Sequence, residues 1–136
     1  MPSSNTSCEL VRVLVADDND AMLTRVAAIL TPACSVVGAV TDGRAALEAV
    51  QTLNPDVIVL DISMPGLTGL EVASRLRTAH CDAAVVFLTV HDEEAFVLAA
   101  RAAGGIGYVI KRRLGTDLVR AVMDAKAGRS FVSALR

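Results

Sequence analysis

An apolar run at residues 57–60, Val-Ile-Val-Leu, constrains the fold more than any other part of the sequence, because it ends directly on Asp61. An Asn-Pro pair at 54–55 precedes the run and a Pro-Gly pair at 65–66 follows it. A short β-branched run between such breakers is typical of a strand that is covered on both faces in a parallel sheet. Ligands bind parallel sheets at the carboxyl ends of the strands, so we expect Asp61 to take part in chemistry. The alternative is that Asp61 only caps the following helix.

Similar apolar strands recur along the chain. Together with the strand that ends on Asp61, they begin near residues 10, 35, 56, 84 and 106. Helical patterns follow them at residues 19–30, 44–53, 68–78, 91–103 and 117–127. Alternating strands and helices form parallel sheets with right-handed crossovers. The sequence therefore predicts an α/β fold with a five-stranded parallel sheet, in the doubly wound, flavodoxin-like order 2-1-3-4-5, and helices on both faces.

Composition and charge narrow the class of protein. Hydrophobic residues make up 53% of the chain, but it has no Trp, one Tyr and three Phe, which favours an aliphatic core. The 13 Lys and Arg against 15 Asp and Glu give a net charge of −2, which is not the basic footprint of a nucleic-acid binder. Three unevenly spaced cysteines, a polar beginning and the lack of an apolar run of about 20 residues predict a cytoplasmic protein that does not enter a membrane.

Polar residues also stand at the ends of other predicted strands. Asp17 and Asp18 follow the first strand, Thr89 ends the fourth, and Lys111 follows the fifth. Together with Asp61, the acidic pair would place three carboxylates at one edge of the sheet, where they repel one another unless they share a cation. Mg²⁺ suits such a group because it binds carboxylate oxygens and leaves positions for a phosphoryl oxygen.

Asp61 is the candidate nucleophile, since a carboxylate can accept a phosphoryl group as an acyl phosphate. Lys111 could pair with that group, and the hydroxyl of Thr89 could donate a hydrogen bond to it. Ordinary explanations exist for each residue taken singly. Asp17 and Asp18 could cap a helix, Thr89 is a common strand residue, and Lys111 could be a solvated surface charge. Their shared position at strand ends favours a common site.

Four motifs occur in order along the chain: the pair Asp17-Asp18, DVIVLDISMPG with Asp61, FLTVHDEEAF with Thr89, and AGGIGYVIK with Tyr108 and Lys111. In this order and spacing they resemble the receiver domain of two-component response regulators, over residues 10–127. The segments LTVHDEEAFVLAARAAGGIGYVIK and LVRAVMDAKAGRSFVS look most like the NarL/FixJ subfamily.

The resemblance implies phosphotransfer from a sensor histidine kinase to Asp61. It also implies that Asp18, Asp61 and the main-chain carbonyl of Ser63 bind Mg²⁺ directly, and that Asp17 binds it through water. Such a domain is a signalling switch that assists its own phosphorylation and dephosphorylation, and not an enzyme with a separate substrate. The phosphoryl group adds about −1.5 to −2 charges, which can bias a two-state surface.

In this family the change is expected to run through Thr89, which moves toward the phosphoryl oxygens and lets Tyr108 turn inward. The surface formed by the fourth helix, fifth strand and fifth helix then changes. Phe96, Val119 and Met123 lie off the core stripes of the predicted helices and could form a homodimer or effector face.

The expected organisation is a flexible lead-in at 1–9, a receiver domain at 10–127, and the start of a linker or C-terminal tail at 128–136. In the NarL/FixJ subfamily a linker leads to a DNA-binding helix-turn-helix, so we expect transcription control, and DNA contact, only through an output domain that this chain does not contain. One alternative is a stand-alone receiver that relays phosphate or binds a protein. A distant alternative is a haloacid-dehalogenase-like phosphatase, which needs a second Asp where this chain has Ser63.

Overall fold

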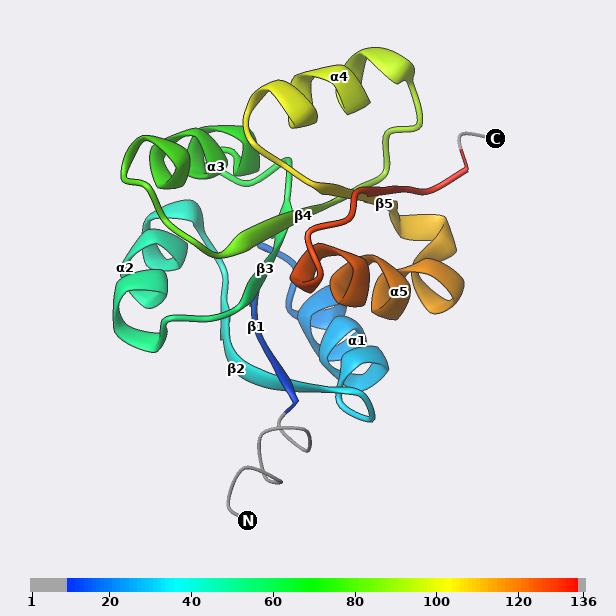
Figure 1. Cartoon of the computed structure of the whole chain (residues 1–136), viewed down its shortest axis with the longest axis horizontal. Helices are drawn as coiled ribbons and strands as arrows, with labels where there is room; N and C mark the ends of the chain where they lie inside the picture. The colour runs from blue at the N-terminus through cyan, green and yellow to red at the C-terminus, as the bar shows by residue number, and fades with distance from the viewer. Residues whose placement is uncertain (1–9, 135–136) are drawn as a thin grey trace.

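The structure, a computed structural model, describes residues 10–134, so the expected lead-in at 1–9 lies outside the described residues. Within that range, six parallel strands form one sheet in the order β2-β1-β3-β4-β5-β6 (Figure 1). The strands are β1 (Val11–Ala16), β2 (Cys34–Val40), β3 (Val57–Asp61), β4 (Ala84–Thr89), β5 (Gly107–Ile110) and β6 (Phe131–Val132). The predicted α/β fold and its strand order are confirmed.

The prediction of five strands is one strand short. β6 pairs with β5 in the segment that we expected to be the start of a linker or tail. A strand of two residues has no measurable periodicity, so its side-chain pattern could not reveal it.

Five helices cover the sheet: α1 (Asp20–Leu30), α2 (Gly43–Leu53), α3 (Gly69–Thr78), α4 (Glu94–Ala102) and α5 (Leu114–Lys126), all within residues 10–134. A one-turn 3₁₀ helix, η2 (Lys111–Arg113), joins β5 to α5. The buried side chains of α1 and α5 pack on one face of the sheet, and those of α2, α3 and α4 pack on the other (Figure 1). No helix in this described part of the chain is long and apolar enough to cross a membrane.

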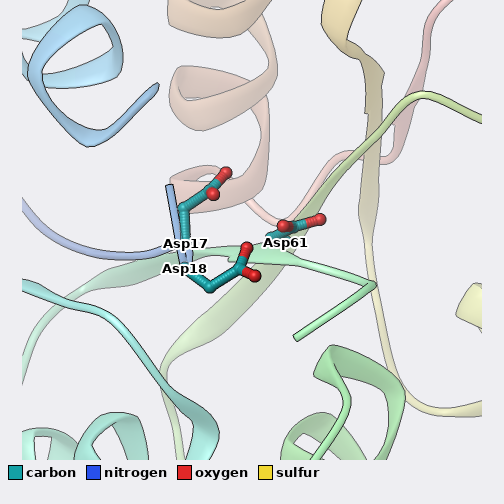
Figure 2. Close-up of side chains that lie close together, drawn as sticks. All are labelled: Asp17, Asp18 and Asp61. Atoms are coloured by element: carbon teal, nitrogen blue, oxygen red, sulfur yellow. The ribbon is translucent and has the colours of Figure 1, made fainter. Parts of the chain in front are cut away.

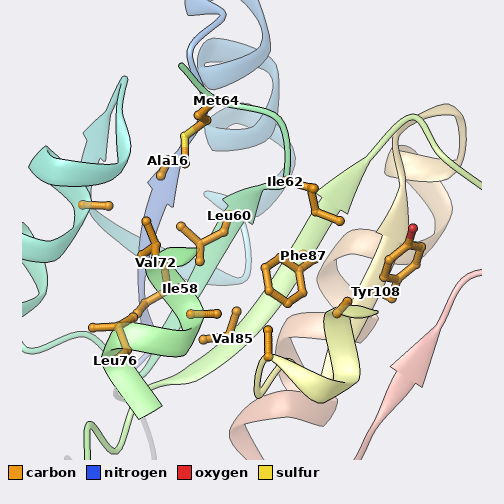
Figure 3. Packing of buried hydrophobic residues seen from close by; sticks show 14 of the residues in the cluster. Ala16, Ile58, Leu60, Ile62, Met64, Val72, Leu76, Val85, Phe87 and Tyr108 are labelled. Atoms are coloured by element: carbon orange, nitrogen blue, oxygen red, sulfur yellow. The ribbon is translucent and has the colours of Figure 1, made fainter. Parts of the chain in front are cut away.

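The central strand shows why its sequence is apolar without a break. Ile58 and Leu60 belong to the core cluster beneath α2, α3 and α4, which Figure 3 shows around Phe87. Val57 and Val59 belong to the cluster beneath α1 and α5. Because successive side chains of a strand point to opposite faces, both sets are buried only when both faces are covered. The interpretation of residues 57–60 as a central strand is therefore correct.

Two helix boundaries differ from the prediction. α4 begins at Glu94 and not at residue 91, and α5 begins at Leu114 and not at Asp117. The last helix was predicted from a core stripe that begins at Leu118, but α5 starts earlier, so that Asp117 lies in its first turn. The carboxylate of Asp117 is buried there and accepts hydrogen bonds from Arg113 and Ser133.

Phe96, Val119 and Met123, which we expected to lie outside the core stripes of their helices, pack against the core. Phe96 is half-buried against the cluster under α2, α3 and α4, and Val119 and Met123 are half-buried against the cluster under α1 and α5. These three side chains complete the core at its margins, because they lie at the borders of the buried stripes of their helices. The homodimer stays a prediction, and the positions of these three side chains do not support it.

Candidate functional site

The structure brings the three predicted carboxylates together at the carboxyl edge of the sheet. Ala16 and Leu60 are register partners, so the residues that follow them, Asp17 and Asp61, end neighbouring strands. One carboxylate oxygen from each of Asp17, Asp18 and Asp61 lies within 4.8 Å of the others (Figure 2). Asp17 and Asp61 are buried and Asp18 is exposed. We call this cluster of two buried carboxylates and one exposed carboxylate at the sheet edge the acidic pocket.

Lys111 points into the same pocket. Its Nζ lies 3.2 Å from Oδ2 of Asp17 and 3.5 Å from Oδ2 of Asp61. Only 17% of its side chain is exposed, which rules out the alternative of a solvated surface charge. β5 ends at the residue before Lys111 and η2 begins at Lys111, so the strand aims this ammonium group at the acidic cluster.

Burial and crowding set the electrostatics of Asp61. Desolvation, and next the charge of Asp17, raise the pKa of Asp61 to about 6, and the nearby Lys111 offsets only part of this rise. The carboxylate of Asp61 is therefore ionised at pH 7, and its ionisation lowers the free energy of unfolding. Such a group gains from any additional cation in the pocket.

Asp17 shows where such a cation fits. Its Oδ1 accepts a hydrogen bond of 2.9 Å from the backbone N–H of Asn19. Its Oδ2 is buried and, among residues 10–134, receives no hydrogen bond of good geometry, although Lys111 lies 3.2 Å away. A buried carboxylate oxygen in this state is costly, and a hard cation with its bound waters would satisfy it. The side chain that caps α1 is that of Asn19, so Asp17 and Asp18 are not its N-cap residue.

The loop after Asp61 is held in place by the start of α3. The backbone N–H of Ser63 donates 3.2 Å to Oδ1 of Asp61, and that of Gly69 donates 2.8 Å to the carbonyl of Ile62. A Cβ at position 69 would collide with the carbonyl oxygen of Asp61, so only glycine allows the helix to start so close to the strand end. Thr68 and Glu71 form a capping box that fixes this start.

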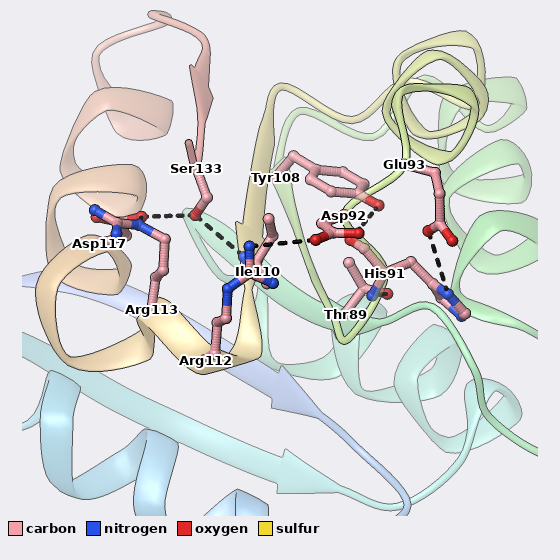
Figure 4. Close-up of polar contacts among 10 residues, drawn as sticks. All are labelled: Thr89, His91, Asp92, Glu93, Tyr108, Ile110, Arg112, Arg113, Asp117 and Ser133. Atoms are coloured by element: carbon pink, nitrogen blue, oxygen red, sulfur yellow. Dashed lines mark hydrogen bonds and ion pairs between the residues drawn. The ribbon is translucent and has the colours of Figure 1, made fainter. Parts of the chain in front are cut away.

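Thr89 and Tyr108 meet at His91, in the loop between β4 and α4 (Figure 4). The hydroxyl of Thr89 accepts from the N–H of His91 at 3.1 Å, and the hydroxyl of Tyr108 donates to the carbonyl of His91 at 3.2 Å. Tyr108 is 2% exposed, and burial raises its pKa to about 12. We expected the ring to turn inward after phosphorylation, whereas it is already buried in this structure, where it belongs to the same core cluster as Phe87.

Two further buried polar residues were not expected from the sequence. Asp117 was interpreted as a helix start, and Ser133 lay in the expected tail. The structure buries both of them and joins them by a hydrogen bond of 2.7 Å. Since the two residues are 16 apart in the sequence, only the fold brings them together.

A doubly wound α/β domain binds its ligands at the carboxyl ends of its strands, and here that edge carries three carboxylates and a largely buried lysine. Residues 13–123 match the response regulator receiver domain family, and this chain belongs to that family. The haloacid-dehalogenase-like alternative is not favoured by this match.

Relatives of known name support the subfamily. The chain is 39% identical to the probable transcriptional regulatory protein NarL of Mycobacterium tuberculosis, over 96% of this chain and 61% of that protein. It is 35% identical to the response regulator GacA of Pseudomonas viridiflava, over 91% of this chain and 59% of that protein. The chain therefore spans about three fifths of the length of these relatives.

A solved structure is also similar. The signal receiver domain of the response regulator NarL from Mycobacterium tuberculosis superposes with a TM-score of 0.85 and 38% identity, over 89% of this chain and 99% of that chain. This chain is thus a receiver domain of the NarL type, and its class is that of signalling switches.

Proposed function

We propose that Asp61 accepts a phosphoryl group from a sensor histidine kinase. The observation that carries this proposal is the pocket itself: a buried strand-end carboxylate with a raised pKa, beside two further carboxylates and 3.5 Å from an ammonium group. In the transfer, an oxygen of Asp61 forms a bond to phosphorus as the phosphorus–nitrogen bond to the histidine of the kinase breaks. The electron pair of that bond leaves with the imidazole. Asp61 must be ionised to attack, as it is at pH 7.

The pocket fits Mg²⁺, with Asp18, Asp61 and the main-chain carbonyl of Ser63 as direct ligands and Asp17 as a ligand through water. The buried Oδ2 of Asp17 supports this assignment because it lacks a well-directed donor. When bound, the ion would neutralise the negative charge that gathers on the transferring group. Lys111 holds a second positive charge beside Asp61 and can pair with a phosphoryl oxygen.

The signal then passes through the His91 peptide. The Thr89 hydroxyl now accepts a hydrogen bond from the N–H of His91, and its own O–H proton is available to a phosphoryl oxygen, so a shift of Thr89 toward that oxygen would pull on the bond to His91. The carbonyl of the same residue holds the hydroxyl of Tyr108. A movement of Thr89 therefore loosens the loop that precedes α4 and, with it, the contact that holds Tyr108. This is how phosphorylation would change the surface of α4, β5 and α5.

In the cell, this domain would act in the cytoplasm and control transcription through a DNA-binding output domain joined after the receiver. The names of the relatives and their greater length support this, and residues 10–127 would be the receiver domain. The alternative is a stand-alone receiver that relays phosphate or binds a protein. A reading frame that continues past Arg136 into a basic helix-turn-helix favours the first role, and a stop codon favours the second.

Intact-mass spectrometry tests the acceptor. Wild-type protein incubated with acetyl phosphate and Mg²⁺ should gain the mass of one phosphoryl group and lose it again in hydroxylamine, which cleaves acyl phosphates. Asp61→Asn is the matched control, because it keeps the shape of the side chain and removes its charge. If this variant is labelled as well as wild type, the acceptor is another residue. If neither is labelled while a control receiver is, the proposal is wrong.

A further inference from the structure

The C-terminal segment is attached to the edge of the sheet beside the site. The N–H of Phe131 donates 3.1 Å to the carbonyl of Ile106, and the N–H of Ser133 donates 2.8 Å to the carbonyl of Tyr108. β6 has only two residues, and pairing of that length holds a strand weakly. An additional interaction is needed to hold it there.

Ser133 provides that interaction through its side chain (Figure 4). Its hydroxyl donates 2.7 Å to Oδ2 of Asp117 and accepts 3.1 Å from the N–H of Ile110. Ser133 and Asp117 are 1% and 7% exposed, so this charge-assisted bond is shielded from water. Although burial alone would raise the pKa of Asp117, hydrogen bonds from Ser133, Arg113 and Thr116 hold it below its usual value, so the carboxylate stays charged.

The same two residues hold both ends of the turn that carries Lys111. Ile110, just before the turn, is bound by Ser133, and Arg113, its last residue, donates from Nε to Asp117 at 2.9 Å. The turn η2 has no side-chain cap of its own. Because Ser133 and Asp117 are bonded to each other, one bridge spans the turn from the residue before it, Ile110, to its last residue, Arg113.

We propose that Ser133 and Asp117 are positioning residues for Lys111, so that the docked strand β6 and the Asp61 pocket are energetically coupled. This inference rests on the proposed function of Asp61. The coupling is reciprocal: whatever fixes Lys111 in the pocket tightens β6 on β5 by the same factor. The chain that continues beyond Ser133 would thereby sense the state of the pocket without touching it. A strand that only covers the sheet edge would show no such link.

The first test needs no phosphorylation. Amide hydrogen exchange at Ser133 and Ile110 is measured in wild type, in Lys111→Met and in Arg112→Met, which changes the exposed neighbour in the same turn. The coupling predicts that Lys111→Met speeds exchange at both amides by about 5-fold, the lower end for coupled sites, and that Arg112→Met does not. Unchanged exchange in Lys111→Met overturns the proposal. Because this arm is free of phosphate, its outcome is independent of whether Asp61 is the acceptor.

The second test measures the rate of labelling by acetyl phosphate. Ser133→Ala leaves Asp117 with Arg113 and Thr116, and the control is Ser130→Ala in the exposed part of the same segment. We expect Ser133→Ala to slow labelling by about 5-fold and Ser130→Ala to have no effect.

A double variant shows whether the effect runs through the lysine. In a Lys111→Met background, Ser133→Ala should cause no further loss of rate, because the group it positions is gone. A loss as large as in wild type would mean that Ser133 acts by another route, and the proposal would fall. Ser133→Thr keeps the hydroxyl and should restore the rate. If Ser133→Ala does not melt cooperatively, the hydrogen-exchange measurement on Lys111→Met still tests the coupling between Lys111 and β6.

Discussion

Replacing Asp61 by Asn should make the metal-free protein more stable at neutral pH, although it removes the candidate acceptor. The variant keeps the size of the side chain and its place at the end of β3. It removes a charge that is buried beside Asp17, which is the reason why the pKa of Asp61 is raised. The ionised carboxylate of Asp61, which is needed for the reaction, therefore lowers the stability of the folded protein.

The size of the effect follows from the pKa. A rise from 3.8 in the unfolded chain to about 6 in the folded protein corresponds to about 3 kcal/mol in the free energy of unfolding. Because the pKa of this acid is raised by folding, the free energy of unfolding falls as the pH rises. The stabilising contribution of protonated Asp61 is complete below pH 3.8 and is lost as the pH rises through about 6. Wild type and variant should therefore be alike near pH 3.8 and differ by about 3 kcal/mol at pH 7.

Urea denaturation in EDTA, at several pH values between 4 and 8, measures this difference. At pH 7 a gain of about 3 kcal/mol would raise Tm by on the order of 10 °C. Asp82→Asn, which removes an exposed carboxylate on the amino edge of the sheet, is the matched control. An Asp61→Asn protein that is equally or less stable than wild type at pH 7 would refute the reasoning, because Lys111 would then fully compensate the buried charge.

Three further predictions concern the same edge of the sheet. Mg²⁺ at a hundred times its Kd should stabilise wild type by about 2.7 kcal/mol in thermal melts, and Asp18→Asn should need more Mg²⁺ for the same rise; equal titrations would place the ion elsewhere. Gly69→Ala should lower the free energy of unfolding by about 1–3 kcal/mol in urea, since its Cβ meets the carbonyl of Asp61, and an unchanged midpoint would mean that α3 can shift freely. Thr68→Ala should cost about 1 kcal/mol in the same assay because it removes the cap of α3, whereas Thr78→Ala at the other end should cost less; the reverse order would contradict the capping box.

The part of the site that the sequence revealed is the part set by local rules. Asp17, Asp61 and Lys111 each follow an apolar strand, and parallel strands bring their carboxyl ends to one edge whatever the details of packing. Their meeting within a few ångströms could therefore be predicted from strand ends alone. Asp18, next to Asp17, is the exposed member of the cluster.

What the sequence did not reveal depends on contacts between distant segments. β6 is too short to carry a pattern, and the bond between Ser133 and Asp117 exists only because α5 brings the chain back along β5. The position of the Tyr108 ring also depends on contacts between distant segments. Whether its ring lies inward or outward depends on the loop at His91 and on the core around Phe87, and neither is encoded in the residues next to it.

The short strand β6 also matters for how copies of this protein meet one another. Without it, β5 would present its row of backbone N–H and C=O groups to solvent, and an open strand of this kind is a template for pairing with a second chain. Phe131 and Ser133 occupy those groups at the carbonyls of Ile106 and Tyr108. Truncation before residue 131 should therefore increase self-association at high concentration. By pairing with β5, the two residues of β6 would therefore also oppose association of two copies through this edge of the sheet.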